Sequence, residues 1–299
     1  MTMMNALIAG LLAGLLGLWG AIPAVAAEEV NIETVPVRDG IYMLVGQGGN
    51  IGLFIGEDGT FLIDDQFAPL TEKHLAAIRA AGGDTPRFLI NTHYHADHTG
   101  GNENLGKTGT LISSHDNVRE RLTVETVIQA FNMVTPPLPK DALPVVTFST
   151  DLTFHLNGDT LHTFHVPNAH TDGDSVIHFQ KANVIHTGDI LFNGFYPFID
   201  VDHGGSLKGM IAAADVILAL ANGDTKLIPG HGPLSDRAQL QAYRDMLATV
   251  YERLGKLQAK GMDAATAVAA QPLADLEERW GKDLFTGDKW VGLIYGGLD

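Results

Sequence analysis

Residues 92–101 read THYHADHTGG, and this stretch decides how the rest of the chain is interpreted. It follows a short apolar run that predicts a buried strand. Side chains two residues apart in an extended backbone point to the same side, so we expect His93 and His95 to converge on one metal ion. Asp97 and His98 follow where the chain turns, which places them to face a second ion. The two closing glycines allow a tight turn into the next element.

Three later stretches carry further candidate ligands. His170 lies in the turn-rich loop PNAHTDGDS, between two predicted strands. Asp189 ends the segment HTGD, and the two oxygens of a carboxylate can bridge two cations roughly 3.5–4 Å apart. His231 is held by glycines and prolines in the rigid loop PGHGP. Asp172 and Asp174, which neighbour His170, are expected to form the turn or to support the ligands from behind.

Predicted strands and helices alternate along the remaining sequence, which indicates an α/β fold. Strands are expected at 31–37, 41–46, 51–55, 61–63, 88–91, 110–113, 145–148, 152–156, 160–165, 175–179, 184–186 and 225–228, and helices at 71–81, 207–220, 236–259 and 264–270. The stretches LFIGEDGTFLIDD (53–65) and IHFQKANVIHTGD (177–189) both run strand, polar turn, strand and Asp. This echo predicts two similar sheets packed face to face, with helices outside. Residues 123–143 contain three prolines and little periodicity, so we expect a mobile loop or lid there.

The composition excludes several classes of protein. The 299 residues are 45% hydrophobic and 18% charged, so the chain can bury a sizeable core. The 35 acidic and 19 basic residues give a net charge of −16, which opposes binding to nucleic acid. The chain has no cysteine, and this rules out disulfides, thiol nucleophiles, cysteine-ligated zinc and iron–sulfur clusters.

The N-terminal region reads as a secretory signal peptide, residues 1–26. Residues 6–27 are almost continuously apolar, and the small-x-small sequence Ala24-Val25-Ala26 precedes two glutamates. We therefore expect a periplasmic or secreted protein without stable membrane insertion, whose residues 27–299 form one domain with a helical C-terminal appendage from about residue 236. The alternative is an uncleaved membrane anchor, because about 20 apolar residues can span a bilayer and no Lys or Arg precedes them.

The ordered set HxHxDH, His, Asp, His at positions 93–98, 170, 189 and 231 resembles the metallo-β-lactamase superfamily. The resemblance covers about residues 30–236. It implies an αββα sandwich of two mixed β-sheets with helices on the outer faces, and a site along one edge of the two sheets. Asp64 matches the family's early aspartate, which braces the metal loop from behind.

The resemblance also implies a centre of two Zn²⁺ ions. One ion would take His93, His95 and His170, the other would take Asp97, His98 and His231, and Asp189 would bridge them. Imidazole and carboxylate ligands without thiolate suit zinc best, with iron or manganese as alternatives.

The activity that this resemblance implies is zinc-dependent hydrolysis of a carbonyl C–N, C–O or C–S bond, such as a cyclic amide or ester, in a small-molecule substrate. Two zinc ions lower the pKa of a water molecule toward 7, and the bridging hydroxide attacks the carbonyl while Asp97 orients it as the catalytic residue. One alternative is a β-lactamase acting on β-lactam antibiotics. The other is a non-hydrolytic metal-binding accessory protein. The sequence leaves the oligomeric state open.

Two departures from relatives bear on the substrate. Asp189 stands where the cysteine-ligand resistance enzymes carry Cys, as it does in the thioesterase and lactonase branches, and no Lys follows it to grip a β-lactam carboxylate. Lactonases often have a Tyr close behind this Asp, whereas the nearest here is Tyr196. The aromatic segment 193–198 is expected to line the pocket. Among the other histidines, His115 and His203 are the two that most merit a test.

Overall fold

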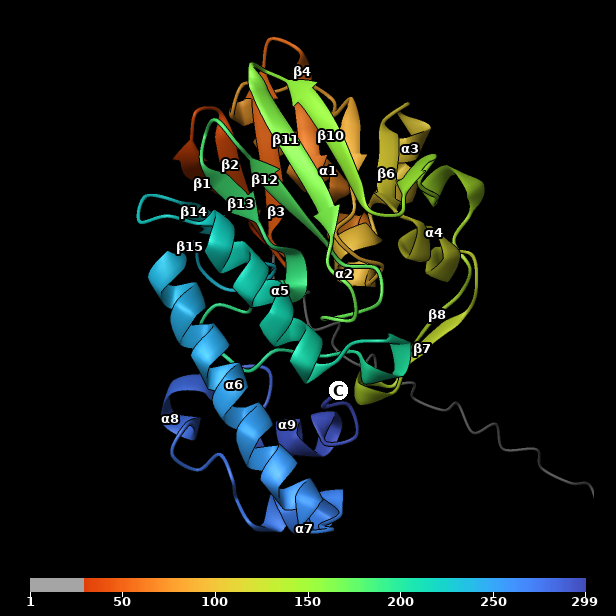
Figure 1. Cartoon of the computed structure of the whole chain (residues 1–299). Helices are drawn as coiled ribbons and strands as arrows, with labels where there is room; N and C mark the ends of the chain where they lie inside the picture. The colour runs from red at the N-terminus through yellow and green to blue at the C-terminus, as the bar shows by residue number, and fades with distance from the viewer. Residues whose placement is uncertain (1–29) are drawn as a thin grey trace, which may run out of the picture. The chain divides into compact units, whose positions relative to one another are not determined.

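Two large β-sheets organise the part of the chain that the computed structural model describes, residues 30–299 (Figure 1). The expected signal peptide lies outside the described residues. The first sheet runs, in spatial order, β1 (Glu33–Arg38), β2 (Ile41–Val45), β3 (Ile51–Gly56), β4 (Gly59–Ile63), β5 (Phe88–Ile90), β6 (Leu111–His115) and β9 (Val146–Phe148). The second sheet runs β10 (Asp151–Leu156), β11 (Asp159–His165), β12 (Ser175–Phe179), β13 (Val184–His186), β14 (Lys226–Ile228) and β15 (Ser235–Asp236).

Both sheets are mixed. In the first sheet, β1 to β4 are antiparallel neighbours, and β4, β5, β6 and β9 run parallel. In the second sheet, β10 to β13 are antiparallel, β14 is parallel to β13, and β15 is antiparallel to β14. The hairpins β3–β4 and β12–β13 hold equivalent places, because a parallel neighbour follows the second strand of each. This equivalence accounts for the echo between residues 53–65 and 177–189.

Helices fill the connections and the C-terminal region. They are α1 (Thr71–Ala80), α2 (Ala96–Thr99), α3 (Asn102–Lys107), α4 (Asp116–Leu122), α5 (Leu207–Leu220), α6 (Arg237–Ala259), α7 (Ala264–Ala269), α8 (Glu277–Trp280) and α9 (Gly287–Ile294). Short 3₁₀ turns lie at Ala68–Leu70, Gln129–Phe131, Lys140–Ala142, Gly188–Ile190 and Val201–His203. Helices α5 and α6 begin as predicted, because the side chains of Ser206 and Asp236 accept hydrogen bonds from backbone N–H groups of the first turn.

The two sheets and the helices on their outer faces form four layers, and an apolar cluster fills each of the three spaces between neighbouring layers. Side chains alternate along β4, so Phe61 and Ile63 join the cluster between the two sheets. Leu62 points to the other face and packs with Leu75 of α1. The third cluster lies between the second sheet and α5, α6 and the C-terminal helices, and it buries Trp290 completely. The predicted αββα sandwich is therefore confirmed.

Residues 123–143, where we expected a mobile loop or lid, contain regular structure that the sequence did not indicate. They contain a small antiparallel hairpin of β7 (Thr126–Ile128) and β8 (Met133–Thr135), joined through a left-handed Asn132. Each strand has only three residues, which is too short for a period-two pattern to stand out in the sequence.

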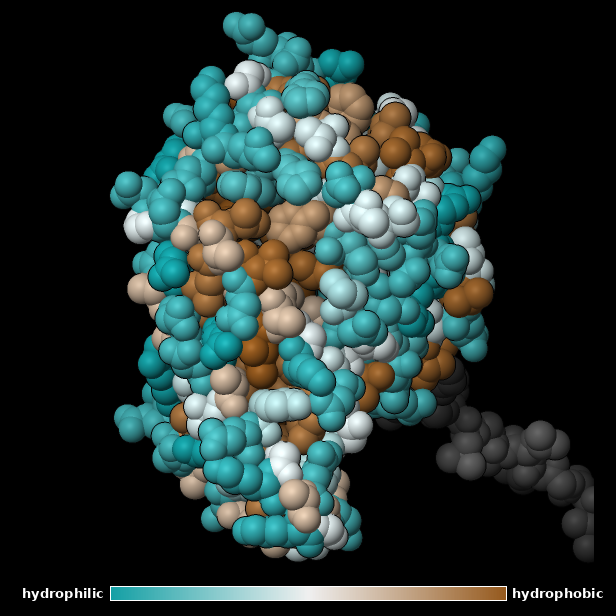
Figure 2. Space-filling model, in the orientation of Figure 1, coloured by the Kyte–Doolittle hydropathy of each residue, from teal (hydrophilic) through white to brown (hydrophobic). Residues whose placement is uncertain are grey.

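The outer surface carries scattered apolar side chains. Figure 2 shows brown, apolar residues in the middle of one face, over α5 and the adjoining strands, and Val216 and Leu220 of α5 are exposed. Within residues 30–299 no helix has both the length and the apolar character that crossing a membrane requires.

The parallel strand pairs determine where a site can form. Strands β4 and β5 end at the same edge of the first sheet, and β13 and β14 end at one edge of the second. The segments that follow these strands begin at Asp64, Asn91, Thr187 and Pro229, so the candidate ligands of distant sequence regions are delivered to a common edge.

Candidate metal centre

The seven predicted ligands come from four segments, and the structure gathers them into two neighbouring groups. Within each group the ligand atoms lie within 4.8 Å of one another. We call the first group His93, His95, His170 and Asp189, and the second group Asp97, His98 and His231.

The first group is buried. The Nδ1 atom of His95 lies 3.1 Å from Nε2 of His93 and 2.9 Å from Nε2 of His170. The Oδ2 atom of Asp189 lies 3.4 Å from Nε2 of His170 and 3.8 Å from Nε2 of His93. Four ligand atoms therefore face one point, and all four side chains are buried.

Outer hydrogen bonds decide which nitrogen of each ring faces that point. The Nδ1 atom of His170 lies 2.8 Å from the carbonyl oxygen of Phe198. A carbonyl only accepts, so we assign the proton of His170 to Nδ1 and the lone pair to Nε2. The Nε2 atom of His95 lies 2.9 Å from Oδ2 of Asp200, which likewise leaves the lone pair of His95 on Nδ1. Both lone pairs then point inward, as metal ligation requires.

Asp64 orients one ring in each group. Its Oδ2 atom accepts hydrogen bonds from the Thr92 hydroxyl and from Nδ1 of His98, both at 2.7 Å. Because the Thr92 hydroxyl donates to Asp64, it accepts from Nδ1 of His93 at 3.0 Å. The Nε2 atoms of His93 and His98 are thus left as inward-facing ligands, and the support expected from Asp64 is present in the structure.

The second group is more open. The Nε2 atom of His231 lies 3.4 Å from both Nε2 of His98 and Oδ2 of Asp97, and Nε2 of His98 lies 3.6 Å from Oδ2 of Asp97. The side chains of Asp97 and His231 are 27% and 22% exposed. This group is therefore accessible to solvent.

Asp189 stands between the two groups. Its Oδ1 atom lies 3.1 Å from Nε2 of His98, and its Oδ2 atom lies 3.3 Å from Nε2 of His231 and close to the rings of the first group. The buried Oδ1 atom accepts no hydrogen bond from residues 30–299. A buried carboxylate oxygen without a hydrogen bond is costly, and a divalent cation beside it would remove that cost.

Two glycines allow the backbone to pass close to these ligands. A Cβ atom at Gly49 would lie 2.1 Å from Cε1 of His98, and one at Gly230 would lie 2.0 Å from Oδ1 of Asp189. Any side chain at either position would displace a ligand. The donor set, imidazole and carboxylate without thiolate, together with the unsatisfied Asp189 oxygen, fits divalent metal ions.

The electrostatics of the two groups differ. Burial lowers the pKa of His170 to about 4 and holds the pKa of His93 well below its usual value, so both rings are neutral. Burial acts in the same direction on His231, but the carboxylates of Asp189 and Asp97 outweigh it and raise its pKa to about 9. Burial would raise the pKa of Asp97, yet the His98 and His231 rings, which carry positive charge when they bind no metal ion, lower it to about 2. The second group therefore favours positive charge between its members.

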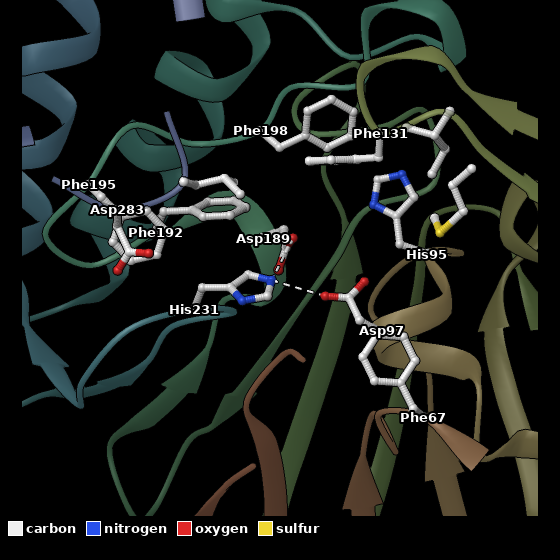
Figure 3. Close-up of a pocket in the computed structure, with 13 residues that line it drawn as sticks. Phe67, His95, Asp97, Phe131, Asp189, Phe192, Phe195, Phe198, His231 and Asp283 are labelled. Carbon is white, nitrogen blue, oxygen red and sulfur yellow. Dashed lines mark ion pairs between the residues drawn. The ribbon is translucent and has the colours of Figure 1, made fainter. Parts of the chain in front are cut away.

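A pocket of about 290 Å³ opens above the ligands (Figure 3). Its polar lining includes His95, Asp97, Asp189 and His231. Its apolar walls are formed by Phe67, Ile128, Phe131, Met133, Phe192, Phe195, Phe198 and Leu284. Among residues 30–299, neither Lys nor Arg lines this pocket, and Asp283 is the one further charged residue in its wall.

A sequence profile described as the metallo-beta-lactamase superfamily matches residues 44–231, which include all seven ligands of the two groups. The chain belongs to this superfamily. Most of its members are hydrolases. The seven side chains of this superfamily member, brought together at one edge of the sandwich, indicate binding of divalent metal.

Solved structures with the same fold support this assignment at the level of architecture. The metallo-beta-lactamase DIM-1 is 18% identical, with a TM-score of 0.58 over 74% of this chain and 100% of its own. The metallo-beta-lactamase from Pontibacter korlensis is 19% identical, with a TM-score of 0.59 over 73% of this chain and 99% of its own. A double mutant of the sec-alkyl sulfatase PisA1 is 16% identical, with a TM-score of 0.65 over 89% of this chain and 49% of its own. No curated protein matches the chain significantly in sequence.

Sequence reasoning missed one carboxylate that supports this superfamily site. Asp200 accepts hydrogen bonds from Nε2 of His95, from Nδ1 of His203 at 2.8 Å and from the hydroxyl of Tyr94. The hydrogen bonds from His95, Tyr94 and His203 keep the pKa of Asp200 low despite its burial. His203 therefore acts on the first group through Asp200. Asp200 belongs to no recognisable sequence motif, because it lies 14 residues after the end of β13 in a connection without strand or α-helix.

The other residues singled out in the sequence support the fold and lie outside the two ligand groups. Asp174 caps the loop of His170 by accepting its backbone N–H at 2.7 Å, and Asp172 forms a two-pronged ion pair with Arg121. His115 stacks on His165 with ring centroids 3.8 Å apart.

The aromatic segment 193–198 divides between pocket and core. Phe195 and Phe198 line the pocket as expected. Tyr196 points into the core instead, where it is fully buried and stacks on Trp290 at 4.6 Å between ring centroids. Tyr196 is therefore not placed to act on a substrate beside Asp189.

Proposed function

We propose that this chain is a hydrolase with two zinc ions that cleaves a carbonyl C–O, C–N or C–S bond in a small substrate with an apolar body. The observation that carries the proposal is the convergence of seven metal-ligand side chains beneath a pocket whose walls are mainly phenylalanine. Esters, lactones and thioesters are the substrate classes that this combination favours.

The two groups divide the work of holding metal. The first group would hold one ion in a buried site, and the second group would hold the other at the pocket floor, with Asp189 shared between them. Bound in this way, a zinc pair supplies a water molecule of lowered pKa and polarises a carbonyl oxygen.

Side chains of the protein would orient the nucleophile and exclude bulk water from the reacting carbonyl. Asp97 projects into the pocket, and its carboxylate, whose pKa is lowered, stays ionised and would accept a hydrogen bond from the attacking nucleophile and orient it. Phe67 and the aromatic rings of the opposite wall shield the reacting carbonyl from bulk solvent, which strengthens electrostatic interactions there (Figure 3).

β-Lactam hydrolysis is the weaker candidate. A β-lactam antibiotic carries a carboxylate, and neither Lys nor Arg among residues 30–299 lines the pocket to pair with it. The likeness to solved β-lactamases is below 20% identity and concerns the fold.

The decisive experiment is a substrate panel with purified, zinc-loaded protein. We expect hydrolysis of a phenyl ester, a homoserine lactone or a thioester, loss of that activity with chelator, and its return with Zn²⁺. A chromogenic cephalosporin and a secondary alkyl sulfate complete the panel. Cleavage of the cephalosporin alone would identify a β-lactamase, and cleavage of the sulfate alone would contradict carbonyl hydrolysis. No turnover of any substrate with two metals bound would instead favour a metal-binding accessory protein.

Export is part of the proposal. We propose that residues 1–26 direct the chain out of the cytoplasm and are removed near Ala26, on the basis of the apolar run and the small-x-small sequence. N-terminal sequencing of the protein from a periplasmic or secreted fraction tests this. A mature chain that still begins at Met1 would favour the membrane anchor.

A further inference from the structure

The C-terminal region contributes to the pocket, although the superfamily profile ends at residue 231. Asp283 and Leu284, in the connection between α8 and α9, line its wall. In the view of Figure 3, Asp283 lies beside Phe195, on the opposite side of the pocket from His95 and Asp97. A carboxylate therefore stands in the substrate-binding space, away from the metal ligands.

This connection is anchored on both sides of Asp283. Phe285 is buried in the core cluster of the second sheet, and the Glu277 carboxylate accepts the backbone N–H of Gly287 at 2.7 Å. The backbone carbonyl of Trp280 accepts the N–H of Tyr196 at 2.9 Å. The last bond ties the connection to the aromatic segment 193–198, so the carboxylate is held against the pocket wall.

Asp283 forms no ion pair with another described residue, although Lys282 precedes it in the sequence. The side chain is exposed, and no ion pair or hydrogen bond with another of the described residues involves it. Since Lys and Arg are absent from the described lining, a substrate group that enters this part of the pocket meets one negative charge and several aromatic rings.

That combination suits a cation. A positively charged nitrogen is attracted by a carboxylate and by the faces of aromatic rings, and methylated ammonium groups also gain from apolar contact. A carboxylate at the same place is repelled. The net charge of −16 on the chain acts in the same direction at long range.

The two ends of the pocket would thus favour substrate groups of opposite charge. Two bound dications, partly offset by the carboxylates of Asp97 and Asp189, would leave positive charge at the floor, where it would attract the oxygen of a scissile carbonyl. Asp283 places negative charge at the wall. A substrate with a carbonyl at one end and a cation at the other would match both.

We propose that the pocket selects substrates with a positively charged, alkylated nitrogen distant from the scissile carbonyl, and that Asp283 is the specificity-determining residue. This inference rests on the proposed hydrolase function for the position of the scissile bond. It concerns a binding preference that is measurable without turnover.

The test uses three phenyl acetates that differ only in the para substituent: trimethylammoniomethyl, neopentyl or carboxymethyl. The neopentyl group has the shape of the ammonium group without its charge. For zinc-loaded wild type and the Asp283→Asn variant, kcat/KM is measured on each ester. In the variant, we expect the ratio of cationic to neutral ester to fall about fivefold and the ratio of anionic to neutral ester to rise.

Asp288→Asn is the matched control. Asp288 is an exposed acid five residues further along the chain, and it does not line the pocket. It removes the same charge from the same region, so we expect both ratios to stay within about twofold of wild type. Equal changes in the two variants would overturn the proposal, because the effect would then come from overall charge.

A binding measurement separates this proposal from the proposed function. Calorimetry with benzyltrimethylammonium as the probe is expected to show about fivefold weaker binding to Asp283→Asn and unchanged binding to Asp288→Asn. Failure of all three esters with this binding difference present would contradict ester hydrolysis and leave the cation site supported. Turnover of the neutral ester with unchanged ratios and unchanged probe binding would overturn the role of Asp283.

Discussion

The two ligand groups lie side by side and share Asp189, yet they differ in burial and in support. Every side chain of the first group is buried, and outer hydrogen bonds orient each of its three rings. The second group exposes Asp97 and His231 to the pocket. In the proposed function, the first group would retain an ion and the second would bring an ion, nucleophile and substrate together.

Removing the shared carboxylate is expected to have the largest effect. Asp189→Asn keeps the shape of the side chain but removes the charge that faces both groups. We expect activity to fall by at least about 10³-fold and the metal content to drop from two ions to fewer than one. Kinetics and elemental analysis of the purified variant measure both. Retention of two ions would show that the groups bind metal independently, and Asp288→Asn controls for the loss of one negative charge.

Asp97→Asn tests the open group alone. We expect activity to decrease by about 10²-fold or more while at least one metal ion remains, because the first group is untouched. Metal content and kcat/KM are determined on the same preparation. Full activity in this variant would refute the role of Asp97, and loss of all metal would show that the groups depend on each other.

Asp200→Asn tests the support behind the first group. The amide cannot hold the proton on Nε2 of His95 as a carboxylate does, so we expect about 10- to 100-fold weaker binding of the tighter ion. Competition with a chromophoric chelator measures this, and kcat of the fully loaded variant should change less than its metal affinity. Unchanged affinity for both ions would show that packing alone holds His95 in place.

The smallest predicted effect concerns stability behind the second group. His74 donates toward Gln66, whose side chain holds the backbone of Gly49 beside His98. Burial lowers the pKa of His74 to about 4, from about 6.5 in an unfolded chain. The unfolded state therefore binds the proton more readily between these values, and the free energy of unfolding falls as the pH decreases through this window.

Urea unfolding of metal-free protein at pH 7.5 and 5.5 measures this contribution. From pH 7.5 to 5.5, we expect the free energy of unfolding to fall by about 1 kcal/mol more in wild type than in His74→Gln. Exposed His155→Gln serves as the control, with a pH dependence like that of wild type. An identical pH dependence in wild type and His74→Gln would contradict the shifted pKa.

Local backbone geometry explains why many of the candidate ligands could be predicted from the sequence. His93 and His95 face one point because extended backbone repeats every two residues, and this needs no information from elsewhere in the chain. Asp189 and His231 are found by similar means, since each follows a short apolar strand in a turn rich in glycine or proline. The repeated strand–turn–strand pattern predicted two packed sheets, and the family resemblance carried by the ordered ligands implied the αββα sandwich that the structure confirms.

Tertiary structure alone decided the rest. Asp200, Asp283 and the β7–β8 hairpin act on the site from segments with no motif of their own, because their partners are distant in sequence and no local periodicity records such contacts. Even Tyr196, which sequence position placed near Asp189, turned away to stack on Trp290, since burying two large rings together outweighs proximity along the chain. The sequence by itself thus determined the candidate ligands, through short-range spacing and the family resemblance, whereas the pocket's shape and charge arose only when distant segments packed against one another.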